Sequence, residues 1–336
     1  MTSVSTRAKV WIGLWVVYVV WGSTYLGIEL AGETMPGLFG AGVRFTIAGL
    51  LMLGFIAWRR GPGTLRIRRA ELASAAVVGL LLPGANSILF ITEQKVPIGL
   101  TSLIIAAIPL WVLLLRLAAR ERPDLISTIG LVIGFGGIVL LVHPGSDTGP
   151  LSYLLLTVAG SFMWALGSFL SPRMPVPKDA LVATGYEMLA GGLVLLVIGL
   201  FAYSPTELDP GRWSGRSIFG LVYLIVFGSL LGYSAYVWLL ANAPIAKVST
   251  YAYVNPVIAI ALGVIVLDES ITLRIVLGAL LILAAVAIVL QRESASTAPP
   301  DRPGGRGREP ARARWRRAGP RRPPRSRPRS AARRRP

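Results

Sequence analysis

Ten runs of mostly apolar residues, each about twenty residues long, constrain this chain more than any other feature of its sequence. A helix needs roughly 20 apolar residues to cross a lipid bilayer. Of the 336 residues, 54% are hydrophobic and 15% are charged, against about 25% charged in a typical soluble domain. The sequence therefore predicts an all-α integral membrane protein with ten transmembrane helices, at residues 10–30, 38–58, 71–92, 98–118, 125–142, 151–171, 181–203, 216–239, 246–267 and 271–290.

Basic residues are distributed unevenly between alternate loops. One set of loops and ends holds 13 Lys and Arg residues, whereas the alternating set holds four, Lys95, Arg212, Arg216 and Arg274. Loops rich in Lys and Arg stay in the cytoplasm. The bias therefore predicts a multi-pass protein of the bacterial inner (cell) membrane with both termini in the cytoplasm.

The second half of the chain repeats the first. The matching pairs lie 143 to 148 residues apart and include Trp21 and Trp164, Arg44 and Glu187, Pro109 and Pro256, and Glu121 and Glu269. Each half, residues 1–145 and 146–291, contains five predicted spans. Because five is odd, the halves must cross the membrane in opposite orientations. Inverted repeats are typical of secondary transporters, which bind their substrate near the bilayer midplane between the repeats.

The order of the repeated motifs resembles a known family. The first half carries Trp21-Gly22-Ser23-Thr24, Pro36, Arg44-Phe45, Pro109, Glu121-Arg122 and Gly130, and the second carries Trp164-Ala165, Pro256, Glu269 and Gly278. Over residues ~10–290 the chain resembles the EamA-type branch of the drug/metabolite transporter (DMT) superfamily. It departs from the repeat at Ala165, which replaces Gly22, and at Glu187, which replaces a basic residue. The resemblance implies ten helices, cytoplasmic termini, and export or uptake of amino acids, sugars, nucleotide derivatives or drug-like amphiphiles.

Polar and aromatic side chains within the spans are the candidate substrate-binding residues. Charged groups inside a bilayer are costly, and buried amides and phenols require partners that a solute can supply. In the fold that the resemblance implies, the helices carrying most of these residues line a central cavity. The candidates are Trp21, Tyr25, Arg44, Asn86, Trp164, Glu187, Tyr233, Tyr236, Tyr253 and Asn255. The alternatives are structural: Arg44 and Glu187 could cap backbone or extend to the interface, and aromatic residues also form interfacial belts.

Four acids and two prolines lie near helix ends or within spans. Glu29 and Glu93 end their spans and are expected to be solvated at the interface. Glu121 and Glu269 are expected to share a structural role, as acceptors for the amides that begin the following helix. The two prolines that match between the repeats, Pro109 and Pro256, are predicted to interrupt their helices. They are hinge candidates, with static kinks as the alternative.

The composition bears on the remaining function classes. The chain has no cysteine and one histidine, His143, so the sequence predicts no metal site, no cofactor and no cysteine nucleophile. The prediction is a secondary transporter, an exporter of small organic metabolites such as amino acids or drug-like amphiphiles, with protons as a candidate coupling ion through Glu187. A homodimer is compatible with the sequence. The alternative is a lipid-modifying membrane enzyme, for which the loop at residues 204–215 offers no recognisable catalytic arrangement.

Residues 292–336 form an Arg- and Pro-rich tail. It contains 16 arginines and three acids, which gives it a net charge of +13 out of the chain's +18. Such a composition cannot form a core and predicts disorder. Membrane lipid head groups are candidate partners. The tail has a single aromatic residue, Trp315, so no specific nucleic-acid partner is expected. The alternative is a tail without function, such as a GC-rich sequence translated out of frame.

Overall fold

The computed structural model describes residues 6–121, 123–142 and 148–297, and in them the predicted all-α membrane architecture is confirmed. Eight continuous helical stretches in this part of the chain are long and apolar enough to cross a membrane, and two shorter apolar helices complete the set of about ten. The helices are α1 (Thr6–Gly32), α2 (Gly37–Arg60), α3 (Arg69–Thr92), α4 (Ile98–Ala106), α5 (Ile108–Ala118), α6 (Leu125–Leu141), α7 (Leu151–Leu170), α8 (Ala180–Ala202), α9 (Gly215–Tyr223), α10 (Gly232–Asn242), α11 (Ile245–Val248), α12 (Tyr251–Leu267) and α13 (Leu273–Thr297).

Three spans are built from more than one helical piece. Helices α4 and α5 form one span, with a break at Ala107, two residues before Pro109. Helices α9 and α10 are joined by a π-helical segment, η4 (Leu224–Leu231), and α11 precedes α12. Pro256 lies inside the continuous helix α12 and does not end it, and its role as a hinge or static kink stays a prediction. The interruption in that span comes before α12, between Val248 and Tyr251.

Helices α2 and α8, the second helices of the two halves, run antiparallel. At one end Arg60, the last residue of α2, forms an ion pair of 2.6 Å with Asp179, which precedes α8. At the other end the amide of Leu38 donates to the hydroxyl of Tyr203, which follows α8. Equivalent helices of the two halves therefore cross the protein in opposite directions, as the inverted repeat predicts.

Glycine allows these two helices to approach closely. A Cβ atom at Gly49 would lie 2.6 Å from the backbone nitrogen of Leu189, closer than real Cβ atoms come to other atoms. A Cβ atom at Gly42 would lie 2.5 Å from the nitrogen of Leu196. Small residues at helix contacts are a common means of packing helices in membranes, where apolar burial gives no advantage over lipid.

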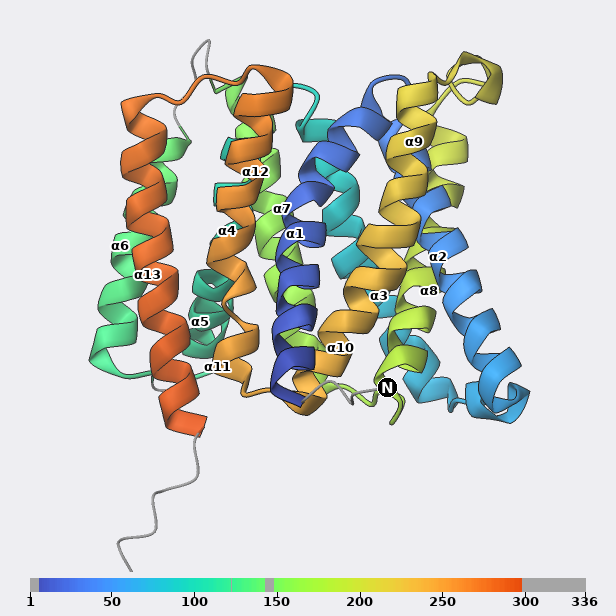
Figure 1. Ribbon diagram of the computed structural model, residues 1–336, viewed down its shortest axis with the longest axis horizontal. Coiled ribbons are helices and arrows are strands. Elements are labelled where there is room, and N and C mark those ends of the chain that lie inside the picture. Colours follow the sequence, from blue (N-terminus) through green and yellow to red (C-terminus); the bar gives the residue numbers. More distant parts are fainter. Residues whose placement is uncertain (1–5, 122, 143–147, 298–336) are drawn as a thin grey trace, which may run out of the picture. The chain divides into compact units, whose positions relative to one another are not determined.

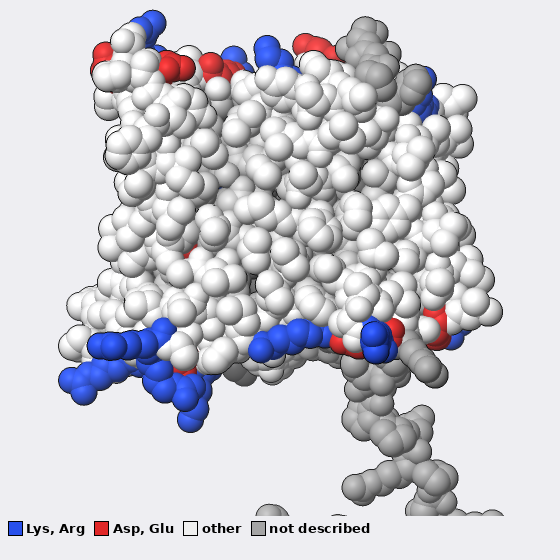
Figure 2. Space-filling view, turned by 180° about the vertical axis from the view of Figure 1, so that it is seen from behind, with Lys and Arg blue, Asp and Glu red and all other residues white. Residues whose placement is uncertain are grey.

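The helix ends define two ends of the bundle. We call the end at which α1 begins the proximal end and the opposite end, where α3 ends and α4 begins, the distal end (Figure 1). Charged side chains gather along both edges of the face in Figure 2, and the surface between them is almost entirely uncharged. Many large apolar side chains of the bundle are exposed, among them Phe55, Phe201 and Leu280. Such a band is suited to contact with lipid.

The predicted disordered tail can be compared with the structure only at its beginning. Helix α13 continues to Thr297, so the first residues of the segment 292–336 are helical. Residues 298–336, which hold nearly all of the tail's arginines, lie outside the described residues.

Candidate functional site

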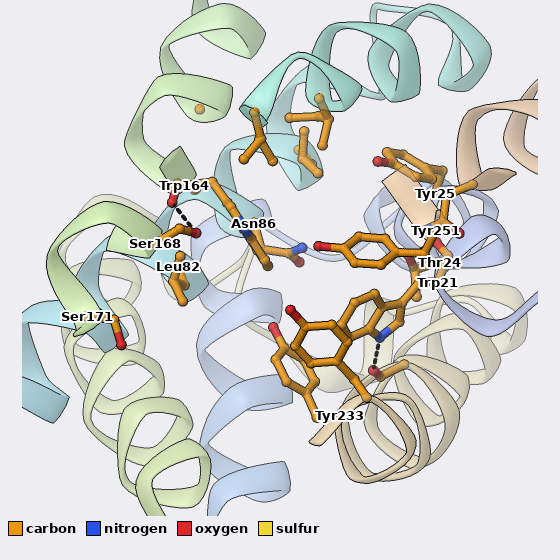
Figure 3. A pocket seen from close by; sticks show the side chains of 18 of the residues that line it. Trp21, Thr24, Tyr25, Leu82, Asn86, Trp164, Ser168, Ser171, Tyr233 and Tyr251 are labelled. Carbon is orange, nitrogen blue, oxygen red and sulfur yellow. Dashed lines mark hydrogen bonds between the residues drawn. The ribbon is translucent and has the colours of Figure 1, made fainter. Parts of the chain in front are cut away.

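A cavity of about 560 Å³ lies among helices of both halves. Its lining comes from α1, α2, α3, α4, α5, α7, α10 and α12, from η4 and from the residues that follow α7 (Figure 3). The lining residues that can form polar or aromatic contacts are Trp21, Thr24, Tyr25, Arg44, Asn86, Trp164, Ser168, Ser171, Tyr233, Tyr236, Tyr251 and Asn255. Apolar residues such as Leu82, Leu89, Ile105 and Ile108 complete it. Small-molecule sites are typically concave, of about 300–1,000 Å³, with a few polar groups on an apolar lining.

An aromatic cluster forms one wall of the cavity. The ring of Trp21 on α1 lies 5.3 Å from that of Tyr233, 5.0 Å from Tyr236 and 5.2 Å from Tyr251, measured between ring centroids. The indole nitrogen of Trp21 donates a hydrogen bond of 3.2 Å to the carbonyl of Gly228, which fixes the ring (Figure 3). A cluster of this kind can stack on an aromatic solute or surround an organic cation.

Arg44 supplies the positive charge of the cavity. It lies in α2 and is 3% exposed. Its Nη1 donates to Oδ1 of Asn86 at 2.7 Å, and its Nε donates to the hydroxyl of Ser229 at 3.2 Å. A guanidinium has five N–H donors, so these two bonds leave others for a ligand. Arg44 takes part in no ion pair within the described part of the chain.

The structure places eight of the ten predicted binding residues in the cavity lining. These are Trp21, Tyr25, Arg44, Asn86, Trp164, Tyr233, Tyr236 and Asn255. Asn86 and Trp164 lie across the cavity from Trp21 and Tyr251 (Figure 3). Whether these side chains bind substrate stays a prediction.

Glu187 and Tyr253 are not among the lining residues. Glu187 lies in α8, half-buried, where α8 packs against α3 so closely that a Cβ at Gly79 would meet the Glu187 carbonyl. Its carboxylate has no hydrogen-bond or ion-pair partner in the residues that the structure describes. The lining therefore carries the positive charge of Arg44 without the negative charge of Glu187. Arg44 and Glu187 occupy equivalent repeat positions but have different surroundings.

Four polar or aromatic lining residues, Thr24, Ser168, Ser171 and Tyr251, are not among the ten candidates. Two of them lie at helical spacing from the candidate tryptophans. Thr24 follows Trp21 by three residues, and Ser168 follows Trp164 by four and donates to its carbonyl at 3.0 Å. Residues three or four apart share a helix face, so helical spacing from the two tryptophans could have found both. The apolar lining residues carry no signal that distinguishes them from residues of the core.

The cavity extends to the proximal end. Its lining includes Ser171, Pro172 and Val176, which follow α7, and Leu240 near the end of α10. Val176 and Leu240 are both exposed, so this part of the lining reaches the surface. The cavity is therefore open toward the proximal end.

The distal end is closed by an apolar seal. We use this name for Ile28, Ala31, Met35, Phe90 and Ile98, all of which are at most 2% exposed and belong to one hydrophobic cluster. Polar contacts surround it: Arg216 pairs with Glu33 at 3.1 Å, and Ser217 bonds Thr34 at 2.9 Å. The bundle is thus open at one end and sealed at the other.

Glu269 also holds the distal end together, although not as predicted. Its carboxylate accepts hydrogen bonds from the amides of Ile98 and Gly99, at the start of α4 rather than of the following helix α13. Burial raises the pKa of Glu269, and the two amides partly oppose that shift. The contact joins the second half of the chain to the first.

Glu121, the repeat counterpart of Glu269, has a different role. It bonds Arg116 and Arg173 at the proximal end, and the hydrogen bond from Arg116 is the main cause of a lowered pKa. The amides that begin α6 are bonded by Asp124 instead. The predicted shared role of Glu121 and Glu269 is therefore wrong.

The prediction for Glu93 is also wrong. Glu93 directly follows α3 and is 4% exposed, so it is not solvated at an interface. Neither carboxylate oxygen has a hydrogen-bond partner among the described residues. Its position at the end of an apolar run predicted a residue at the membrane interface. The apolar run does not show that neighbouring helices pack over this position.

An inverted ten-helix membrane bundle with a one-sided central cavity defines a membrane transporter. The model of the EamA-like transporter family matches residues 9–143 and 151–291, and the chain belongs to this family. It is 36% identical to YedA of Escherichia coli strain K12, described as an uncharacterized inner membrane transporter, over 74% of this chain and 80% of that protein.

More distant relatives extend over a similar range. The chain is 25% identical to the transporter YoaV of Bacillus subtilis, over 83% of this chain and 95% of YoaV. It is 26% identical to the chloroplastic WAT1-related protein At3g02690 of Arabidopsis thaliana, over 83% and 69%. A solved crystal structure with 19% identity aligns with a TM-score of 0.57, over 87% of this chain and 100% of the other. At that identity the likeness concerns the fold alone.

Proposed function

We propose that this protein is a secondary transporter that exports a small organic metabolite carrying a carboxylate, by alternating access between its two inverted halves. The observation that supports this proposal best is Arg44, a buried guanidinium with unused donors and no ion pair in the described chain, inside a cavity open at one end. A carboxylate forms strong charge-assisted bonds with such a group.

The rest of the cavity favours a zwitterion. The Trp21 cluster lies across the cavity from Asn86, which is bonded to Arg44. An amino acid or related metabolite would place its carboxylate on Arg44 and an ammonium or aromatic group against the cluster. The volume of about 560 Å³ can hold a solute of this size.

The proposed direction depends on the charge bias of the loops. The proximal end carries the Lys- and Arg-rich loops, which the positive-inside rule places in the cytoplasm. The cavity would then be open to the cytoplasm, in the state from which an exporter loads its substrate. Opening of the apolar seal and closure of the proximal end would release the solute outside.

Counterflow in proteoliposomes tests the proposal without knowledge of a coupling ion. Proteoliposomes that contain the purified protein are loaded with unlabelled amino acids, sugars, nucleosides or amphiphilic cations in turn, and uptake of the matching labelled solute is measured. Exchange above that of empty liposomes for carboxylate-bearing solutes is the expected result. Exchange of uncharged sugars alone would overturn the proposed substrate class. If folded protein exchanges none of the solutes in the panel, the transport proposal is overturned, and a search for lipid turnover by mass spectrometry becomes the next step.

A further inference from the structure

The most unusual ionisable group outside the cavity lining is Glu93. It is 4% exposed, and both of its carboxylate oxygens lack a partner among the described residues. The hydroxyl of the preceding residue, Thr92, is buried and unpartnered as well. Buried polar groups are nearly always hydrogen-bonded, so an unpartnered carboxyl calls for an explanation.

The charged and titratable groups around Glu93 come from several elements. Tyr25 and Glu29 lie on α1, Arg44 on α2, and Glu269 before α13, and each interacts electrostatically with Glu93. The two acids have donors of their own. Gln94 donates to Glu29 at 3.0 Å, and the amides of Ile98 and Gly99 donate to Glu269.

This arrangement disfavours an ionised Glu93 in the closed distal end. Burial removes water from a carboxylate, and the negative charges of Glu29 and Glu269 would repel it. Arg44 attracts it, but the bonds of Arg44 go to Asn86 and Ser229. A neutral carboxyl avoids both costs.

A proton suits this site better than a metal ion. In the part of the chain that the structure describes, no group of three or more Asp, Glu, His or Cys residues is arranged to hold a metal. The carboxylates of Glu29 and Glu269 are turned to other donors, as described above. A single unpartnered carboxyl can still bind one proton.

We infer that Glu93 is a proton-binding site, neutral while the distal end is closed and ionised when that end opens to water. The inference rests on the transport function proposed above, because only alternating access requires the distal end to open. Glu93 lies at the same end as the apolar seal, and in sequence it stands between two members of the seal, Phe90 and Ile98. Opening the seal would hydrate the carboxyl and allow its proton to leave.

The sign of the pH dependence follows from linkage. The closed state binds the proton more tightly than the open state, so low pH favours closure and rising pH favours opening. One proton per transition allows at most about a tenfold change in the closed-to-open ratio for each pH unit. Proton binding is thereby coupled to the step that exposes the cavity to the distal side.

A cysteine reporter can follow this step, because the chain has no native cysteine. Met35 in the apolar seal is 2% exposed, so the thiol of Met35→Cys should react with a maleimide only when the distal end opens. The protein is placed in nanodiscs, and the reaction rate is measured across pH. Dividing by the rate of Thr206→Cys, an exposed position in the loop after α8, removes the pH dependence of the thiol itself.

The ratio of the Met35→Cys reaction rate to the Thr206→Cys reaction rate is expected to rise several-fold with pH when Glu93 is present. In Glu93→Gln the same ratio should stay low and should not change with pH. The matched controls Glu29→Gln and Glu187→Gln should keep the rise. A flat ratio with Glu93 present, a rise that survives Glu93→Gln, or a rise abolished by Glu29→Gln alone would each overturn the inference.

Two further measurements keep the outcome interpretable. Infrared spectra should show a protonated carboxyl band at neutral pH that Glu93→Gln reduces. If the Gln variant does not fold, Glu93→Asp, which retains the acid, should keep the full band. Persistence of the full band in folded Glu93→Gln would contradict the assignment. Counterflow tests transport separately, since exchange needs no proton gradient: its absence with Glu93 present would overturn the proposed function, whatever the reporter shows.

Discussion

The guanidinium of Arg44 and the side-chain amide of Asn86 meet across helices α2 and α3, with 2.7 Å between Nη1 and Oδ1. Both residues line the cavity. The bond orients the guanidinium while the Nε bond to Ser229 holds its other side. Arg44 is thus a preorganised donor whose position depends on two neighbouring elements.

Replacing Arg44 with Gln should reduce the apparent affinity for a carboxylate-bearing solute by about ten- to hundredfold. A hydrogen bond to a charged group contributes about 1.5–3 kcal/mol, and each 1.4 kcal/mol is a factor of ten. The measurement is the concentration dependence of counterflow for the solute found by the panel. Arg44→Lys should recover only part of the loss, because an ammonium lacks the planar fork of donors.

Arg66→Gln is the matched control for this prediction. Arg66 is exposed in the loop before α3, so the same change in net charge is made away from the cavity. Its affinity should equal that of the unmodified protein. Equal losses in the Arg44 and Arg66 variants would mean that net charge, rather than a contact in the cavity, controls binding.

Trp21→Leu should weaken transport of cationic or aromatic solutes more than that of aliphatic ones. The substitution removes the ring around which Tyr233, Tyr236 and Tyr251 gather. Aromatic and cation–π contacts contribute about 0.5–2 kcal/mol each, which corresponds to about a two- to thirtyfold loss of affinity. Competition between labelled and unlabelled solutes in counterflow measures the preference.

Trp15→Leu provides the comparison for Trp21. Trp15 lies on the same helix but is 58% exposed on the surface of the bundle. The Trp15 variant should keep the solute preference of the unmodified protein. A preference that changes equally in both variants would argue against the aromatic wall as a binding surface.

Much of the fold could be predicted from the sequence because the membrane restricts it to helices of a given length. Apolar runs predicted the spans, and the repeat predicted the antiparallel relation that Arg60–Asp179 and Leu38–Tyr203 now show. The π-helical segment Leu224–Leu231 was not predicted. Its residues are as apolar as those of a membrane-spanning α-helix, so composition does not distinguish a π-helical segment from an α-helical one.

The candidate site was harder to predict because it depends on the rotation of each helix. Trp21 and Arg44 point into the cavity, whereas Glu187, which matches Arg44 in the repeat, does not line it. The repeat determines which helices of the two halves correspond, but it does not determine which neighbouring helices each of them packs against. Glu93 shows the same limit, since its burial arises from elements distant in the sequence.

Gly49→Ala should destabilise the protein, because the added Cβ would lie 2.6 Å from the backbone of α8, which cannot move aside as a flexible side chain can. Overpacking of this kind typically costs about 1–3 kcal/mol. Gly54→Ala on the same helix is the control: nothing lies within 4 Å of its Cβ, and alanine favours the helix by about 1 kcal/mol. Thermal unfolding in detergent should therefore give midpoints that move in opposite directions.

Glu121 should make stability depend on pH on the acid side. It bonds Arg116 at the end of α5 and Arg173 after α7, and these contacts lower its pKa. Because the folded pKa is below the unfolded one, the stabilisation is present above about pH 4.3, the ordinary glutamate value, and is lost as pH falls through the folded pKa. Glu121→Gln should therefore lower the midpoint of thermal unfolding at neutral pH and reduce its decline in acid.

Glu207→Gln separates this effect from the general loss of a carboxylate. Glu207 also has a lowered pKa, but its bonds go to Ser204 within the same loop and join no two helices. Its replacement should change the midpoint less than that of Glu121. If the two variants change the unfolding midpoint equally, the Arg116–Glu121–Arg173 contact does not stabilise the packing of α5 against the segment after α7. Ser171 and Pro172 of that segment border the open end of the cavity.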